Sequence, residues 1–111
     1  IKQAAFAHFK AKMAGELKKF HVEEWNCDIY HRATSTMATE AKMFGLTQSG
    51  KTAEALVESI VQKALDENGN RVFHDTDRVE LMNQVDPNVL IKVASQLNNA
   101  SAETVGDIEK N

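Results

Sequence analysis

A regular apolar pattern in the middle of the chain constrains the fold more than any other feature. Between residues 53 and 65, apolar side chains recur three and four positions apart over about three turns, which is typical of one buried helix face. These side chains are Ala53, Leu56, Val57, Ile60, Val61, Ala64 and Leu65. Asn68 and Gly69 then tolerate the left-handed backbone that ends a helix or closes a tight turn. The sequence therefore predicts a core helix followed by a sharp reversal of the chain.

The residues after this reversal predict a packed corner. Val72 and Phe73 bring two large apolar side chains back toward the core helix, so we expect Phe73 to be buried against it. Residues 75–77, with the sequence DTD, offer oxygens that can cap the free N–H groups of a following helix. Gly69 is expected to have a positive φ.

Helical spacing predicts two further helices in the first half of the chain. Residues 5–17 carry an apolar stripe, with lysines mostly elsewhere around the helix, which indicates an amphipathic first helix. A second helix, capped by Thr34, Ser35 or Thr36, is expected to end at Gly45. A polar loop then continues to Gly50, and Thr52 is a candidate cap for the core helix.

The C-terminal part of the chain is also predicted to be helical. Asp86 and Pro87 stand in the order of cap and first helical residue, and Ser101 precedes a last helix. A shorter helix comes before Asp86. The apolar residues expected to mark these three helices are Val79, Met82 and Val85, then Leu90, Val93, Ala94 and Leu97, and finally Val105 and Ile108.

Alternation replaces helical spacing between residues 20 and 32, where Phe20 and Val22 alternate with polar neighbours. This pattern predicts a short β-hairpin. Trp25 beside the turn and Tyr30 after it are candidate anchors for a partner protein, because aromatic side chains offer large contact areas at small entropic cost. The alternative for Trp25 is that it folds back over the helices.

The predicted fold is mainly α, with about five to six short helices and a short β-hairpin near residues 20–32. A length of 111 residues argues for a single domain. Within it, residues 1–32 form the amphipathic helix and hairpin, and residues 33–111 form the helical core.

Composition disfavours several classes of partner. A net charge of −3 gives no electrostatic footprint for nucleic acid. No apolar run approaches the ~20 residues that span a bilayer, and residues 1–14 lack the apolar core of a signal peptide. Cys27 is the single cysteine and cannot form an internal disulfide, so a reducing compartment such as the cytoplasm is expected.

Residues 45–52, with the sequence GLTQSGKT, satisfy the spacing of a phosphate-binding P-loop. In such a site, glycine-rich backbone N–H groups face the phosphates, Lys51 reaches the outer phosphates and Thr52 holds Mg²⁺. The motif requires a buried strand just before its first glycine, but residues 36–44 are predicted to be helical. Nucleotide binding is therefore kept only as the alternative function.

Two groups of residues resemble parts of known metal sites. Asp66, Asn68 and Asn70 begin like a calcium loop, but Arg71 stands where that loop requires glycine. The soft ligands His21, Cys27 and His31 lack the paired spacing of a zinc site. Neither metal nor cofactor is expected.

Catalytic motifs are missing from the sequence. No Gly-x-Ser-x-Gly and no paired His-Glu motif occurs, and no helix N-terminus is assigned to Cys27 that would activate its thiol. The sequence therefore predicts a protein that is not an enzyme.

The corner resembles a pattern of the tail assembly chaperones of long-tailed bacteriophages. The resemblance rests on the core helix, the sequence DENGNRVF at residues 66–73, the acidic cap at 75–77 and the pair Leu97-Asn98, and it covers residues 53–111. A looser similarity is found in residues 22–25 and 28–30. Asn68 and the pair Asn99-Ala100 depart from the usual family residues at their positions.

This resemblance implies a small α-rich protein without enzymatic activity. Such chaperones are thought to bind and coat the tape measure protein, which fixes tail length, to help recruit tail tube subunits, and to leave before the virion is complete. It implies the cytoplasm of the bacterial host. Because many copies of so small a domain are needed to shield a long partner, neighbouring copies would touch, and we expect weak self-association through the hairpin or a terminal helix that carries Val105 and Ile108. A chain ending at Asn111 would correspond to the shorter of two forms made by frameshifting. A helical adaptor protein of the host is a further alternative.

Overall fold

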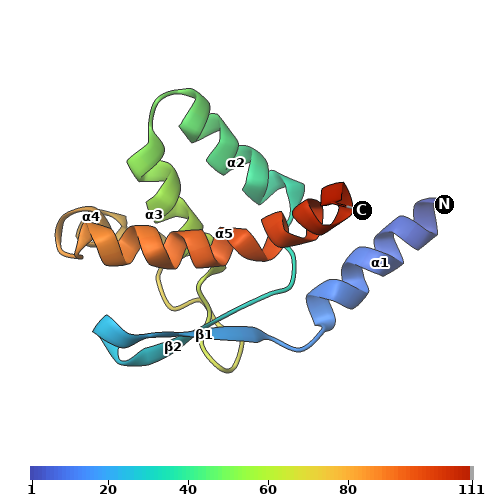
Figure 1. Ribbon diagram of the computed structural model, residues 1–111, viewed down its shortest axis with the longest axis horizontal. Helices are drawn as coiled ribbons and strands as arrows, with labels where there is room; N and C mark the ends of the chain where they lie inside the picture. Colours follow the sequence, from blue (N-terminus) through green and yellow to red (C-terminus); the bar gives the residue numbers. More distant parts are fainter. Residues whose placement is uncertain (111) are drawn as a thin grey trace.

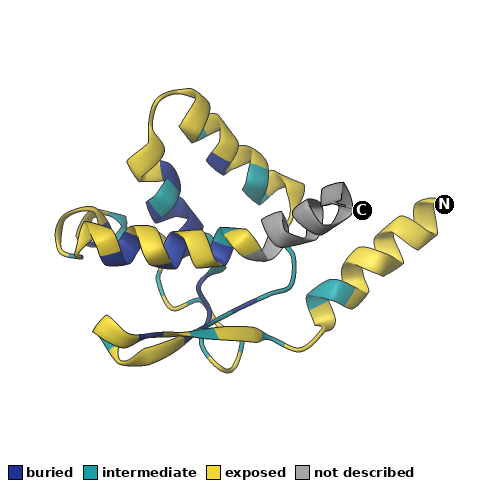
Figure 2. Ribbon diagram, in the orientation of Figure 1, coloured by how far each residue is buried: buried dark blue, intermediate teal, exposed yellow. Residues whose placement is uncertain are grey.

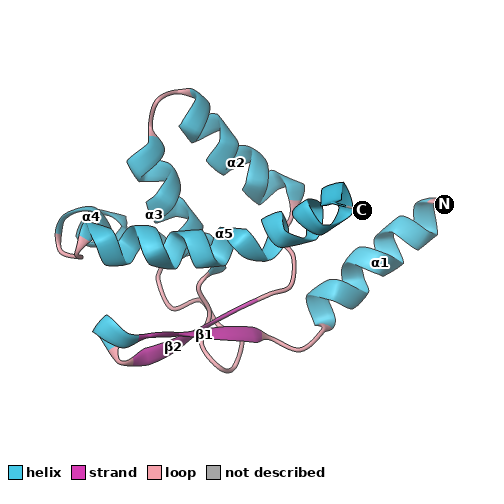
Figure 3. Cartoon of the chain, in the orientation of Figure 1, coloured by secondary structure: helices cyan, strands magenta, loops and turns pink. Residues whose placement is uncertain are grey.

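The computed structural model describes the backbone of residues 1–110 and the side chains of residues 1–99. In this part of the chain, the elements follow in the order α1 (Lys2–Ala14), β1 (Lys18–Val22), the 3-10 turn η1 (Glu23–Trp25), β2 (Cys27–His31), α2 (Met37–Gln48), α3 (Thr52–Lys63), the 3-10 turn η2 (Asp75–Asp77), α4 (Arg78–Asn83) and α5 (Pro87–Lys110). The predicted mainly α fold with one hairpin is confirmed (Figures 1 and 3).

Helix α5 runs through the middle of the molecule. Helices α2 and α3 lie on one side of it and the hairpin on the other, while α4 and α1 lie toward opposite ends (Figure 1). Helix α3 packs against α2, α4 and α5. Figure 2 places buried residues on α3 and α5 and leaves most of α1 exposed.

The core joins the hairpin to three helices. Its buried residues come from both strands, from α3 and the residue after it, from α4 and from α5: Val22, Ile29, Val57, Ile60, Val61, Ala64, Leu81, Val89, Leu90, Val93, Ala94 and Leu97. The apolar stripes predicted for α3 and α5 are therefore the main source of the core. Both helices bury their stripes because each provides the apolar partner surface that the other requires.

The hairpin confirms the alternation that the sequence predicts. Strands β1 and β2 are antiparallel, with Phe20 opposite Ile29 and Val22 opposite Cys27. Val22 and Ile29 belong to the core, and Phe20 packs against it. The reversal itself lies at residues 23–26, where Asn26 has a φ of 49°.

The corner begins where α3 ends, two residues earlier than the predicted end at Leu65. Leu65 leaves the helix and pairs with the hairpin, since its N–H donates to the Tyr30 carbonyl at 2.8 Å and its carbonyl accepts from Tyr30 at 2.9 Å. Gly69 has a φ of 84°, as predicted. Phe73 is half-buried against the core, but Val72 is 44% exposed, so the expectation that both would turn inward is wrong for Val72.

The predicted end of α2 is wrong. Thr36 caps the helix by accepting from the Thr39 N–H at 3.1 Å, as expected, but the helix continues through Gly45 to Gln48. Gly50, with a φ of 79°, makes the turn instead. Thr52 is the first residue of α3 and does not cap it, because Lys51 occupies the capping position.

Two expectations about the C-terminal helices also need correction. In α4 the buried residue is Leu81, while Val79 and Met82 are 72% and 42% exposed. The cap predicted at Asp86 is present, since its carboxylate accepts from the Asn88 N–H at 2.9 Å. Helix α5 then continues without a break past Ser101, because the favourable cap chemistry of a serine does not stop a helix that has already begun.

Candidate partner-binding surfaces

The hairpin places the two aromatic residues that the sequence singled out in different settings. Trp25 is half-buried against the core, and its ring meets Phe73 edge-on at 6.4 Å between centroids. Tyr30 lies on the outer face of β2, where the Lys19 ammonium is 6.0 Å from its ring centroid. Trp25 thus folds back toward the helices while keeping an exposed edge, and a partner contact through either residue stays a prediction.

The other two predicted contact residues, Val105 and Ile108, lie outside the residues whose side chains the structure describes. Their backbone belongs to the last turns of α5 and not to a separate helix.

Helix α1 is the largest element that buries nothing. Phe6 is 65% exposed and Phe9 is 40% exposed. A hydrogen bond helps to hold its end to the rest of the molecule: the Arg32 guanidinium donates to the Met13 carbonyl at 3.1 Å. The predicted one-sided stripe is wrong, because the helix ends at Ala14, before Leu17, and its apolar residues are not gathered on one face. No side chain that the structure describes covers Phe6 fully.

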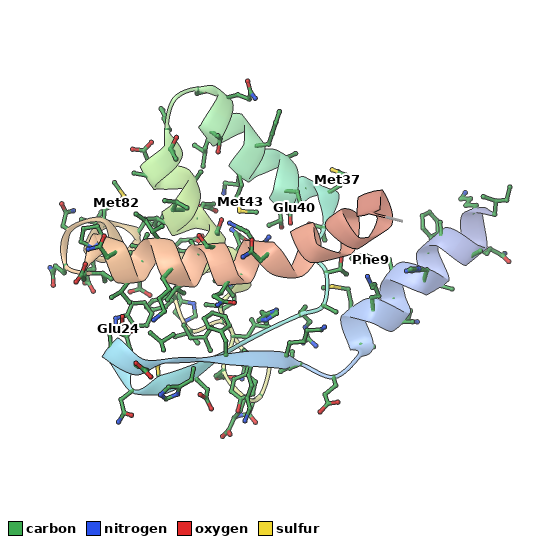
Figure 4. All side chains as sticks on the ribbon, in the orientation of Figure 1. Phe9, Glu24, Met37, Glu40, Met43 and Met82 are labelled. Carbon is green, nitrogen blue, oxygen red and sulfur yellow. The ribbon has the colours of Figure 1, made fainter. Side chains whose placement is uncertain are left out.

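Exposed apolar side chains also occur on α2 and α4. Met37 and Phe44 of α2 are 80% and 65% exposed, and Met82 of α4 is 42% exposed. Met37 and Met82 are labelled in Figure 4. Surface apolar residues scattered singly are ordinary, but exposed phenylalanines on two helices are candidate anchors for protein contacts.

A buried carboxylate lies between α2, α3 and α4. Glu58 is 4% exposed and receives hydrogen bonds from the Arg78 Nε at 2.8 Å and Nη2 at 3.0 Å, while Lys42 and Gln62 approach its Oε1 at 2.9 and 2.8 Å. The Arg78 hydrogen bonds lower the pKa of Glu58 to about 2, against the opposing effect of burial. A carboxylate that is paired in this way stays ionised, so it has the wrong chemistry for a general acid or base near neutral pH.

A second polar network explains the Leu97-Asn98 pair. Leu97 is 2% exposed in the core, while the Asn98 amide donates to the Ser59 hydroxyl at 3.2 Å and accepts from the Lys63 ammonium at 3.0 Å. Lys63 also pairs with Glu40 of α2 at 2.8 Å. The pair thus ties α5 to α3 through one apolar and one polar contact.

The sequence predicts neither this network nor the hydrogen bonds between Glu58 and Arg78, since neither follows from residue spacing alone.

The hairpin separates the soft ligands His21, Cys27 and His31 from one another. His31 faces inward, with its ring 5.9 Å from that of Phe20, whereas His21 is on the opposite face and contacts Asp28 at 2.8 Å. Register places His21 beside Asp28 and His31 beside Lys18, so the two imidazoles cannot meet at one metal ion. Cys27 is exposed at the other end of β2.

Residues 45–52, which match the P-loop spacing, lie where α2 ends, and the backbone N–H groups of the turn are already hydrogen-bonded. Residues 45–48 are helical, and the N–H groups of Ser49, Gly50 and Lys51 donate to the carbonyls of Gly45, Thr47 and Leu46 at 2.8–3.1 Å. A phosphate loop needs these donors to point at the ligand. In the described part of the chain, the one sheet is the antiparallel hairpin, which supplies no parallel strand before Gly45.

The calcium-like residues serve the corner instead. The Asp66 carboxylate accepts the backbone N–H groups of Asn68 at 2.9 Å and Asn70 at 3.0 Å through one oxygen. This arrangement is an Asx turn, which explains the residues without an ion.

Among the described helices, none is long and apolar enough to cross a membrane.

Comparison with known proteins adds one finding. No protein-family model and no curated protein matches the sequence. Among solved structures, the bacteriophage HK97 tail assembly chaperone aligns with a TM-score of 0.58 and 21% sequence identity, over 87% of this chain and 95% of that chain. The chain is similar in fold to a phage tail assembly chaperone. An alignment over 87% of the chain is longer than residues 53–111, so the similarity extends beyond the region that carries the motif.

Proposed function

We propose that this protein is a non-enzymatic chaperone of phage tail assembly, which binds and coats the tape measure protein. The observation that carries the proposal is the fold similarity to the HK97 chaperone, joined to a corner motif that resembles the same family. The proposal includes recruitment of tail tube subunits, action in the cytoplasm of the bacterial host, and release before the virion is complete.

The exposed apolar groups suit such a task. A tape measure protein is a long, helix-rich chain with much apolar surface, and amphipathic helices bind such partners through apolar anchors. Phe6, Phe9 and Phe44 are exposed on two separate helices. A small protein with several such anchors can contact an extended partner and a neighbouring copy at the same time.

Co-expression tests the proposal. The tape measure protein encoded next to this chain should precipitate when it is produced alone and should stay soluble and co-purify when both are produced together. The control is Val61→Asp, which places a charge at a fully buried core position and should abolish the effect by unfolding the domain. A tape measure protein that stays insoluble beside the folded wild-type chain would refute the proposed function.

A further inference from the structure

Helix α1 combines exposed aromatic residues with an unbalanced charge. It carries Lys2, Lys10 and Lys12 and no acidic residue, so its formal side-chain charge is +3. Since the whole chain carries −3, all residues outside α1 together carry −6. Phe6 stands one helical turn after Lys2 and one before Lys10, so its exposed ring is flanked by positive charge.

The corner and α4 form a groove with the opposite character. It has a volume of about 360 Å³ and an apolar lining of Val72, Phe73, Leu81 and Val85, and the carboxylates of Asp77 and Glu80 line it as well. No cationic residue lines it. Asp77 accepts the His74 N–H at 2.7 Å, and Glu80 is exposed without an ion pair to any side chain that the structure describes.

The groove of one molecule is far from its own α1. Helices α1 and α4 lie toward opposite ends of a molecule that is 46 Å long, and Phe9 and Met82 mark these ends in Figure 4. Residues 15–17, which join α1 to the paired strand β1, span at most about 11 Å. A second copy can present its α1 to the groove without any change in either fold.

We propose that copies of this chain associate head to tail, with Phe6 and Phe9 of one copy in the groove of the next. The lysines of α1 then lie near Asp77 and Glu80, which gives the contact both apolar area and complementary charge. Such an interface joins two different surfaces, so it repeats into an open row or closes into a ring. The inference rests on the proposed function, which calls for neighbouring copies, and names the surfaces by which they meet.

Sedimentation velocity on the isolated protein, over a wide concentration range, tests the charge pairing. Lys10→Glu and Glu80→Lys should each weaken self-association about tenfold, because each places like charges across the contact. The two substitutions in one chain should restore most of the affinity, since the pair is then reversed and complementary again. Single variants that associate like the wild type would overturn the proposed pairing.

Two phenylalanines of equal exposure provide a matched control for the apolar part. Phe6→Ala should weaken self-association by about thirtyfold, the loss typical of an aromatic anchor, whereas Phe44→Ala should leave it unchanged. Phe6 and Phe44 are both 65% exposed, so the two variants lose a similar exposed group. The reverse ranking would place the contact on α2 and overturn the inference.

Mixing experiments test whether the interface is head to tail. A chain with Phe6→Asp and Phe9→Asp keeps a functional groove, and a chain with Glu80→Lys and Gln84→Lys keeps a functional α1. Each should be monomeric alone, and the mixture should form a one-to-one dimer and nothing larger. A wild-type chain that is monomeric at every concentration, or a mixture that does not associate, would overturn the inference. Co-expression with the tape measure protein would still test the proposed function separately.

Discussion

At the scale of single residues, Glu58 is a buried charge with partners on three helices. Its carboxylate is buried, and Lys42, Gln62 and Arg78 from α2, α3 and α4 supply its partners. Removing one side of such a pair leaves buried groups without partners, which costs more than the pair itself contributes. No periodicity predicts this arrangement, because Glu58 lies beside the apolar stripe of α3 and looks like an ordinary solvent-facing residue.

Glu58→Gln should make the protein less stable at pH 7 by about 2–3 kcal/mol. The Arg78 hydrogen bonds lower the pKa of Glu58 from 4.5 to about 2, so its stabilising effect is complete above pH 4.5 and is lost as the pH falls toward 2. A pKa shift of this size corresponds to about 3 kcal/mol of pH-dependent stability. Because the cations are partly exposed, solvent screening reduces this pH-dependent part of the loss to on the order of 1–2 kcal/mol.

Urea unfolding at pH 7, 4.5 and 3 measures this effect. The stability difference between wild type and Glu58→Gln should shrink as the pH falls. Glu54→Gln is the matched control, since Glu54 is exposed on the same helix. Equal losses for both variants, or a difference that does not depend on pH, would show that Glu58 does not carry the proposed role.

Two glycines should respond to alanine with opposite signs. Gly69 has a φ of 84°, and an added Cβ would lie 3.0 Å from the Arg32 Nη2, so Gly69→Ala should destabilise by about 1–2 kcal/mol. Gly45 is inside α2 with open space around it, so Gly45→Ala should stabilise by about 0.5–1 kcal/mol. Thermal unfolding measures both. Destabilisation by Gly45→Ala would mean that residue 45 ends the helix after all.

At the scale of elements, the sequence predicts best where a helix or strand buries one whole face. The apolar stripes of α3 and α5 and the alternation of the hairpin are long enough to indicate whether each element is a helix or a strand and where in the sequence it lies. Prediction failed at α4, where Val79 and Met82 suggested the wrong face and Leu81 is buried instead. The third predicted residue, Val85, lies after the helix and packs against the core. A six-residue helix has too few positions for periodicity to distinguish faces, so the neighbouring corner decides which side packs.

The hairpin and the corner should be coupled through Trp25 and Phe73. Their rings meet edge-on, and such pairs contribute about 1 kcal/mol beyond the area that they bury. Phe73→Ala should cost about 2 kcal/mol, less than a fully buried site, because Phe73 is half-buried. A double-mutant cycle with Trp25→Ala measures the coupling. Additive losses would mean that Trp25 is free of the corner and available to a partner.

At the scale of the whole molecule, the candidate site was harder to predict than the fold. The groove at the corner is made by Val72, Leu81 and Val85 together, and only their arrangement in space brings them beside two carboxylates. The sequence did predict a first helix, but it could not indicate that the described part of the molecule leaves Phe6 65% exposed. A surface that binds another molecule is not buried within its own chain, so the residue periodicity that reports burial does not identify it.

The central claim is that many copies of this chain coat one tape measure protein. Native mass spectrometry of complexes with tape measure fragments of two lengths tests it most directly, because the number of bound copies can be counted. A fragment of twice the length should bind about twice as many copies, with intermediate occupancies rare if neighbouring copies also contact each other. One copy per fragment, whatever the fragment length, would contradict the account.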